Sequence, residues 1–205
     1  MNWNTLVSDA SIEKTSKALG TKGYEVIVVE NGKEALEKIK TIIPKGVSVM
    51  NGSSVTLETI GYVDYLKSGK HGWQDFHAKI TAEKDQEKRV NLRKQSALSD
   101  FYLGSLHALT EEGEFLIASN TGSQLSSVVY TSDNLIFVVG TQRIVPTLPD
   151  AFRRLEEYVV PLEDEHMKKL YGSGTRLSKI VVFKHESVYS TRKIRLILVK
   201  EKLGF

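Results

Sequence analysis

A turn of small polar residues at 52–56, Gly-Ser-Ser-Val-Thr, carries the first groups that could hold a ligand. It follows the apolar run 47–50 and precedes the short amphipathic segment 56–60, which predicts a strand, a tight turn and a helix start. The first N–H groups of a helix lack intrahelical partners and favour an anion. The turn therefore predicts a cradle for a carboxylate or phosphate, with the simpler alternative that Ser53 or Ser54 only caps the helix.

Two later turns have the same small, polar character. Residues 120–123 are Asn-Thr-Gly-Ser, and residues 140–143, Gly-Thr-Gln-Arg, follow the apolar run 135–139. If the strands before 52 and 140 are neighbours in one sheet, their turns meet at a common rim. Arg143 would there grip a carboxylate or phosphate with two N–H groups, unless it pairs with a surface glutamate. The predicted ligand-binding residues are Gly52, Ser53, Ser54, Thr56, Thr121, Gly122, Ser123, Thr141 and Arg143.

A catalyst at this rim would also need a base. Glu111, Glu112 and Glu114 lie between the apolar runs 106–110 and 115–118, where a Glu-Gly turn indicates a β-hairpin. Glu111 is the candidate general base, although three carboxylates at a hairpin are also typical of a solvated turn. No metal site is predicted, because His71 and His77 have no companion ligands at suitable spacing.

The elements that would position these turns alternate along the chain. Helices are expected over residues 4–19, 34–43, 56–60, 81–98 and 150–158. Strands are expected over residues 24–29, 47–50, 101–105, 135–139, 179–183 and 194–199. The order in the first sixty residues favours a parallel sheet with helices packed on it, and ligands of such sheets lie beyond the carboxyl ends of the strands. The last strand alternates enough to suggest a place near an edge.

Composition limits the classes of function. A chain of 205 residues with 40% hydrophobic content can bury a full core, so we expect one domain over 1–205, with its first helix within 3–20, the charged helical segment over 81–98 and basic strands within 179–200. The absence of cysteine excludes disulfides, thiol nucleophiles and a cysteine-ligated iron–sulfur cluster in this chain. No secretory leader or 18-residue apolar run is visible, so we expect a soluble, cytoplasmic protein that does not enter membranes.

The distribution of charge indicates a possible binding surface less directly than the motifs do. The net charge is +3, and ten Lys/Arg against two Glu fall within 167–205. This segment is either a partner or phosphate surface or simply a solvated face. We expect no nucleic acid partner, because no motif that reads nucleic acid accompanies the charge.

Several motifs taken together resemble one family. They are GSSVTLETIG (52–61), ALTEEGEFL (108–116), NTGSQLSS (120–127), LIFVVGTQRIVPTLPDAFRRL (135–155) and Pro161. This set is similar to the lactate-utilisation (LUD) domain family, long carried as a domain of unknown function. The resemblance implies an α/β/α fold with a mostly parallel, Rossmann-like central sheet, related to ribose-5-phosphate isomerase, glucosamine-6-phosphate deaminase and CoA transferases. It also implies that the strand-end turn cradles a phosphate or carboxylate.

The resemblance leaves two functions open. The first is binding of a small anionic metabolite at the rim, with or without a reaction. The second is a non-catalytic accessory or scaffold role beside iron–sulfur subunits of a lactate-oxidising assembly; a homo-oligomer also stays open. The chain departs from its relatives in lacking their cysteine-bearing segment after Pro161, in having Gln124 after Gly122-Ser123, and in having His107 where relatives have asparagine. These departures leave the ligand and any reaction unnamed.

Overall fold

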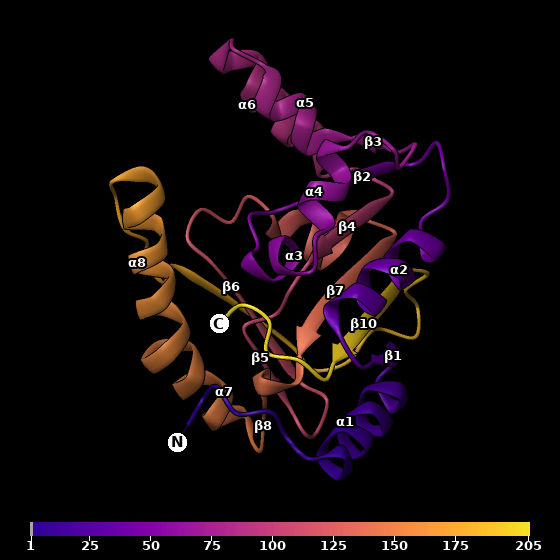
Figure 1. Cartoon of the computed structure of the whole chain (residues 1–205), viewed down its shortest axis with the longest axis vertical. Coiled ribbons are helices and arrows are strands. Elements are labelled where there is room, and N and C mark those ends of the chain that lie inside the picture. Colours follow the sequence, from indigo (N-terminus) through magenta and orange to yellow (C-terminus); the bar gives the residue numbers. More distant parts are fainter. Residues whose placement is uncertain (1) are drawn as a thin grey trace.

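Two stacked β-sheets with helices on either side form the structure, a computed structural model that describes residues 2–205 (Figure 1). The large sheet has all its strands parallel. In spatial order they are β1 (Glu25–Val29), β10 (Lys193–Val199), β7 (Asn134–Gly140), β4 (Phe101–Gly104), β2 (Ser48–Asn51) and β3 (Gln74–Asp75). The small sheet is mixed, with β6 antiparallel to both of its neighbours. Its order is β8 (Ile144–Val145), β5 (Ala108–Thr110), β6 (Phe115–Ser119) and β9 (Lys179–Phe183).

Most of the helices pack against these sheets. They are α1 (Asp9–Thr21), α2 (Gly32–Ile42), α3 (Val55–Thr59), α4 (Tyr62–Lys67), α5 (Phe76–Ala82), α6 (Gln86–Ser96), α7 (Leu148–Arg154) and α8 (Val160–Tyr171). A π-helical turn, Leu155–Val159, joins α7 to α8 in one continuous helical stretch. The predicted α/β class, with a parallel central sheet flanked by helices, is confirmed; the small sheet adds a layer between the large sheet and α7–α8.

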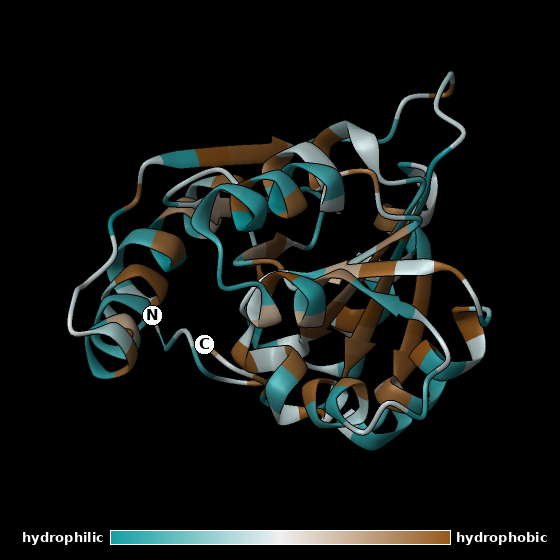
Figure 2. Cartoon of the chain, turned by 90° about the horizontal axis from the view of Figure 1, so that it is seen from above, coloured by the Kyte–Doolittle hydropathy of each residue, from teal (hydrophilic) through white to brown (hydrophobic). Residues whose placement is uncertain are grey.

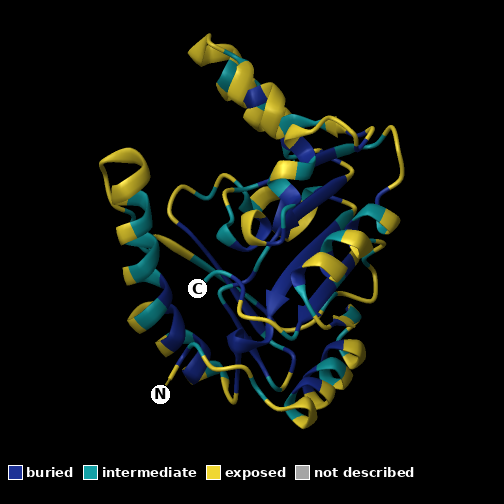
Figure 3. Ribbon diagram, in the orientation of Figure 1, coloured by how far each residue is buried: buried dark blue, intermediate teal, exposed yellow. Residues whose placement is uncertain are grey.

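The strands of the large sheet are apolar on both faces because both faces are covered. In β7, Leu135 and Phe137 pack toward the small sheet and α1, whereas Ile136 and Val138 pack toward α2, α3 and α4. Strands buried on both sides have continuous rather than alternating apolar runs. Figure 2 shows hydrophobic residues concentrated along these strands, and Figure 3 shows the same strands as the most buried part of the chain.

The edge position predicted for residues 194–199 is wrong. β10 lies between β1 and β7, and it pairs with both. The polar residue that suggested alternation, Arg195, sits near the start of the strand, where its Nε lies 2.7 Å from the Glu25 carboxylate. A charged side chain near the start of a central strand can therefore pair with a charge on the neighbouring strand, so it does not indicate an edge.

Two charged segments differ from their predicted form. Residues 81–98 do not make one helix: α5 ends at Ala82, and Asp85 caps the separate helix α6 by accepting a hydrogen bond from Lys88 N at 2.8 Å. The two helices project from the body in Figure 1. The basic strands within 179–200, β9 and β10, belong to different sheets. In the described part of the chain, no helix is long and apolar enough to span a membrane.

Candidate functional site

Three strands of the large sheet end side by side at one edge. β2, β4 and β7 are parallel neighbours, with Asn51 beside Leu103 and Gly104 beside Phe137. The carboxyl ends of such strands meet at the same edge. The turn 52–56, residue Ser105 and the short helical turn 141–143 therefore follow from neighbouring strand ends, as the rim prediction requires.

A cavity of about 750 Å³ opens at this edge, and residues of both sheets, of α5 and α6, and of α8 line it. It brings together most of the residues predicted as ligand contacts. Gly52, Ser53, Ser54, Thr56, Thr121, Ser123 and Arg143 line it. Gly122 and Thr141 are not among the residues that line it. Turn 120–123 reaches the cavity from the end of β6 in the small sheet, and it is the one predicted turn that does not follow a strand of the large sheet.

The turn at 52–56 combines capping with exposure to the cavity. Ser54 caps α3, since its Oγ accepts a hydrogen bond from Leu57 N at 3.3 Å, which is the simpler role considered for it. Ser53 is exposed, whereas Thr56 is buried. A Cβ at Gly52 would come within 3.0 Å of the Tyr102 hydroxyl, so glycine allows this backbone to approach the neighbouring strand closely.

Arg143 is buried and joins three parts of the site. Its Nη2 donates to Thr56 Oγ1 at 2.7 Å and to Leu203 O at 2.9 Å. Its Nη1 donates to Ser105 Oγ at 3.0 Å and to Leu106 O. Both terminal nitrogens thus donate to protein oxygens, so they are not free to bind a carboxylate or phosphate with two N–H groups as predicted. Its positive charge, however, remains at the cavity wall.

Within residues 2–205, neither Arg143 nor its neighbour Arg154 has an anionic partner. Arg154 of α7 is fully buried, donates from Nη1 to His107 O, and lies over the Tyr158 ring at 5.3 Å; its Nε and Nη2 have no hydrogen-bond partner. Within residues 2–205, no carboxylate lies within 4 Å of either guanidinium. Burial, and then the charge of Arg154, lowers the pKa of Arg143 to about 9; burial lowers the pKa of Arg154 to about 10. Both therefore remain charged at neutral pH.

Comparison with known proteins identifies the family. The chain matches the LUD domain over residues 12–199. It belongs to the LUD domain family. Membership suggests a role related to lactate utilisation.

Solved structures support the fold of this LUD domain. A crystal structure of a DUF162 family protein from Deinococcus radiodurans matches with a TM-score of 0.59 and 13% identity, covering 94% of this chain and 99% of that one. At this identity the likeness concerns the fold alone. The beta subunit of eIF2B from Chaetomium thermophilum gives 13% identity over 68% of this chain and 44% of that one, with a TM-score of 0.30, too low to carry an argument. No match was found among curated proteins.

His107, singled out as a departure from the relatives of this LUD domain, lines the cavity. Its Nδ1 accepts a hydrogen bond from Ala118 N at 3.1 Å, which leaves the ring proton on Nε2. Burial, followed by the charges of Arg143 and Arg154, lowers the pKa of His107 to about 3. The ring is therefore neutral at physiological pH, and it offers an N–H donor without adding charge.

The structure does not bring Glu111 to the cavity. Its carboxylate accepts hydrogen bonds from Ser11 Oγ at 2.6 Å and Lys14 Nζ at 3.0 Å, both on α1, and these contacts lower its pKa. The hairpin turn that carries Glu111 packs on α1, so this carboxylate has no position from which to act as a base at the rim. Within residues 2–205, no cluster of three or more metal-ligating side chains is present either.

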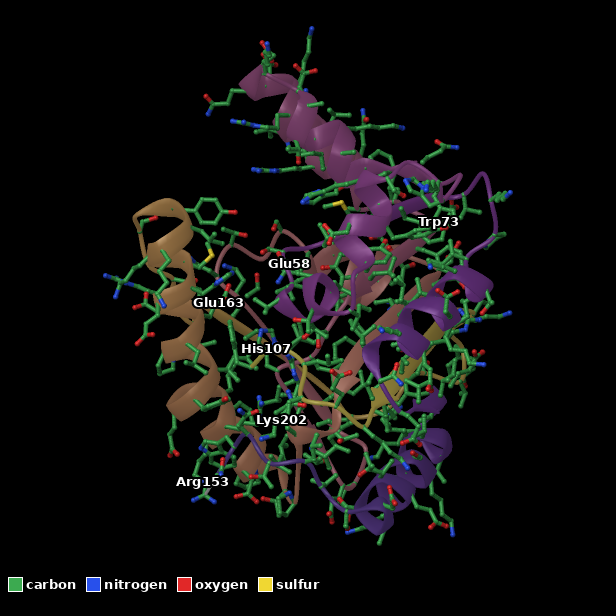
Figure 4. The ribbon with its side chains drawn as sticks, in the orientation of Figure 1. Glu58, Trp73, His107, Arg153, Glu163 and Lys202 are labelled. Atoms are coloured by element: carbon green, nitrogen blue, oxygen red, sulfur yellow. The ribbon has the colours of Figure 1, made fainter. Side chains whose placement is uncertain are left out.

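Glu163 of α8 is the carboxylate that sequence reasoning missed. It is the sole acidic residue among the described residues that line the cavity, and it has no hydrogen-bond or ion-pair partner within 2–205. Burial raises its pKa; the Glu58 carboxylate adds to this effect and His166 opposes it. Figure 4 shows Glu58, His107 and Glu163 around the space between α3 and α8. The available signal was spacing, since Glu163 stands four residues from both Val159 and Met167 on one face of the helical stretch.

Proposed function

We propose that this LUD domain binds a small organic anion, a carboxylate or phosphate metabolite, in the cavity at the strand ends, in a role related to lactate utilisation. One observation carries the proposal: Arg143 and Arg154 are buried and charged, and no carboxylate within residues 2–205 lies within 4 Å of either. Removing a charge from water costs several kcal/mol, which a nearby opposite charge offsets. An anionic guest in the cavity would supply that charge beside Arg143, which lines the cavity, whereas Arg154 is not among the lining residues.

The lining of the cavity fits such a guest. Its charged side chains within 2–205 are Arg93, Arg143 and Arg176 against Glu163. Hydroxyl groups of the turns 52–56 and 120–123 add donors around the rim. At an effective dielectric constant near 20, unit charges about 4 Å apart attract by about 4 kcal/mol, so a favourable net charge at this distance matters for affinity.

A charge introduced at the rim should abolish most of this binding. Ser53 is exposed and lines the cavity, so Ser53→Asp adds a negative charge with little effect on packing. We expect Ser53→Asp to weaken binding of lactate, inorganic phosphate or sulfate by about tenfold or more, because like charges within the cavity repel by about 1.4 kcal/mol or more. Isothermal titration calorimetry measures the change.

Ser126 provides a matched control for that variant. It is also exposed, but it lies outside the cavity, so Ser126→Asp should bind each anion as the wild type does. If none of the three anions binds the wild-type chain at millimolar concentration, the proposal fails.

Sulfate binding should also weaken as the pH rises, because Glu163 becomes charged. The raised pKa of Glu163 places its ionisation above the ordinary glutamate range near 4.3, and the ionised carboxylate repels an anion in the same cavity. Sulfate keeps its charge over this window, and His107 stays neutral. We expect affinity to fall roughly three- to tenfold between pH 4.5 and pH 8, and Glu163→Gln to remove that fall.

The control for this pH effect is His77→Gln, since His77 also lines the cavity. If His77→Gln removes the pH dependence and Glu163→Gln leaves it, Glu163 does not control binding.

The second candidate function is a non-catalytic accessory role beside iron–sulfur subunits of a lactate-oxidising assembly. The projecting pair α5–α6 favours it, since both helices are largely exposed, and Leu98, just beyond α6, leaves 73% of its surface to solvent. Stable co-elution with such subunits in gel filtration at moderate salt would support this role. A chain that elutes without them at every salt concentration would contradict it.

A further inference from the structure

The cavity is much larger than a three-carbon acid requires. Its volume is about 750 Å³, whereas a water molecule takes a share of about 30 Å³ in the liquid. Lactate has six non-hydrogen atoms and would displace on the order of six waters, or about 180 Å³. Such a ligand at the rim would leave about three-quarters of the space unfilled, and a cavity of this size is typical of a drug-sized ligand.

The unfilled part is bounded by an apolar wall. On the helical stretch from α7 to α8, residues facing the cavity recur about every four positions, which places them on one face. Leu155, Val159, Val160 and Met167 are the apolar members of this face, and Glu163 is its charged member. Leu177 and Phe205 also line the cavity.

The protein itself covers this wall only in part. Leu155 and Val159 are buried against the small sheet, but α8 contains no fully buried residue, and Val160 and Met167 stay half-exposed. Figure 3 shows α8 as intermediate to exposed over most of its length. A half-exposed apolar face that borders a cavity gains free energy when an apolar group covers it, by about 25 cal/mol for each Å² removed from water.

The cavity is lined by both polar and apolar groups. Hydroxyl donors and the charge of Arg143 lie at the strand ends, and apolar side chains come from the helical stretch and also from the strands, among them Met50, Ile117 and Phe137. A ligand that satisfies both kinds of group has an anionic head and an apolar body. We propose that the ligand of this cavity is an amphipathic organic anion, with its charged head at the rim and an unbranched chain of about six or more carbons along α8. This proposal rests on the proposed function and names its ligand class.

A homologous series of carboxylates tests the proposal on the full chain. Acetate, butyrate, hexanoate and octanoate share one head group and differ only in apolar length. A fully buried methylene contributes about 0.8 kcal/mol, about fourfold in affinity. We expect at least tenfold tighter binding of octanoate than of butyrate by titration calorimetry, with one octanoate bound for each chain. Affinity that stays flat from acetate to octanoate, while sulfate binds, would overturn the amphipathic ligand and leave the anion site intact.

Two matched variants on α8 distinguish binding in the cavity from binding on the outer surface of the helix. Met167→Gln keeps the side-chain length but makes the apolar wall polar, so it should weaken octanoate binding at least fivefold and leave sulfate binding unchanged. Leu170→Gln changes an exposed residue of the same helix outside the cavity, and it should alter neither. Equal loss in both variants, or several octanoates bound for each chain, would assign the effect to surface adsorption and overturn the proposal. If neither sulfate nor any carboxylate binds, the anion site itself is absent.

Discussion

Replacing Phe115 with alanine should lower the free energy of unfolding by about 3–5 kcal/mol. Phe115 of β6 is fully buried where the small sheet meets the large one. Its ring stacks on Phe183 of β9 at 4.7 Å and lies 5.3 Å from Tyr24 and 5.9 Å from Phe137 of β7. Alanine would remove the central ring of this cluster and leave a cavity that surrounding rings fill only in part. Each lost aromatic pair adds about 0.5–1.5 kcal/mol to the loss of buried area.

Guanidinium chloride unfolding followed by circular dichroism measures this loss. Phe76 of the projecting helix α5 is half-buried and stands outside the three core clusters, so Phe76→Ala is the matched control and should cost less than half as much. A chain of this size should also lose roughly 6–20 °C in melting temperature with Phe115→Ala. Equal transitions for the two variants would mean that the two sheets are not held together at Phe115.

The large sheet was predictable because its buried strands have recognisable apolar runs in the sequence. Residues 135–139 form an unbroken apolar run because both faces of β7 are covered. Residues 34–43 have apolar side chains along one side only, because only one face of that helix packs against the core. The order of these elements then favours parallel pairing. The small sheet was harder to predict, because β8 has only two residues and because the pairings β5–β8 and β6–β9 join segments far apart in the chain.

The candidate site was predictable only in its turns. Glycine and hydroxyl residues after apolar runs identify strand ends, and adjacency of β2, β4 and β7 brings those ends together. Burial is a tertiary property, so the sequence could not distinguish Arg154, which is fully buried, from Arg153, which pairs with Asp150 at the surface. For the same reason Glu111 and Glu163 looked alike as carboxylates, although only Glu163 faces the cavity.

The Arg143 contacts link this site to the stability of the whole edge. Leu203 O accepts hydrogen bonds from Arg143 Nη2 and from Gln142 Nε2 at 3.0 Å, so the segment after β10 is held against the turn after β7. A substitution that separates these two segments should therefore affect both folding and anion binding. The segment after β10 approaches the backbone closely at Gly140, the last residue of β7, where a Cβ would meet atoms of Glu201 and Leu203.

Gly140→Ala should destabilise the chain by about 3 kcal/mol and weaken sulfate binding at least tenfold. A Cβ at this position would lie 2.7 Å from Glu201 O and 2.9 Å from Leu203 N, and it would also meet Gln142 Oε1. Two of these atoms belong to backbone and cannot rotate away, so the segment after β10 must shift, as in other overpacked cores. That shift would remove the Leu203 carbonyl from Arg143 and change the position of the cationic charge at the rim.

The same denaturation and calorimetry experiments measure both effects of Gly140→Ala. Gly20 of α1 is the matched control, because a Cβ there meets no atom within 4 Å, and alanine in a helix is favoured over glycine by up to about 1 kcal/mol. Gly20→Ala should therefore be as stable as the wild type or more so, with unchanged sulfate binding. If Gly140→Ala loses stability but binds sulfate normally, the charge of Arg143 does not depend on the Leu203 contact. If it unfolds at the wild-type denaturant concentration, the two segments do not approach one another as closely as these distances require.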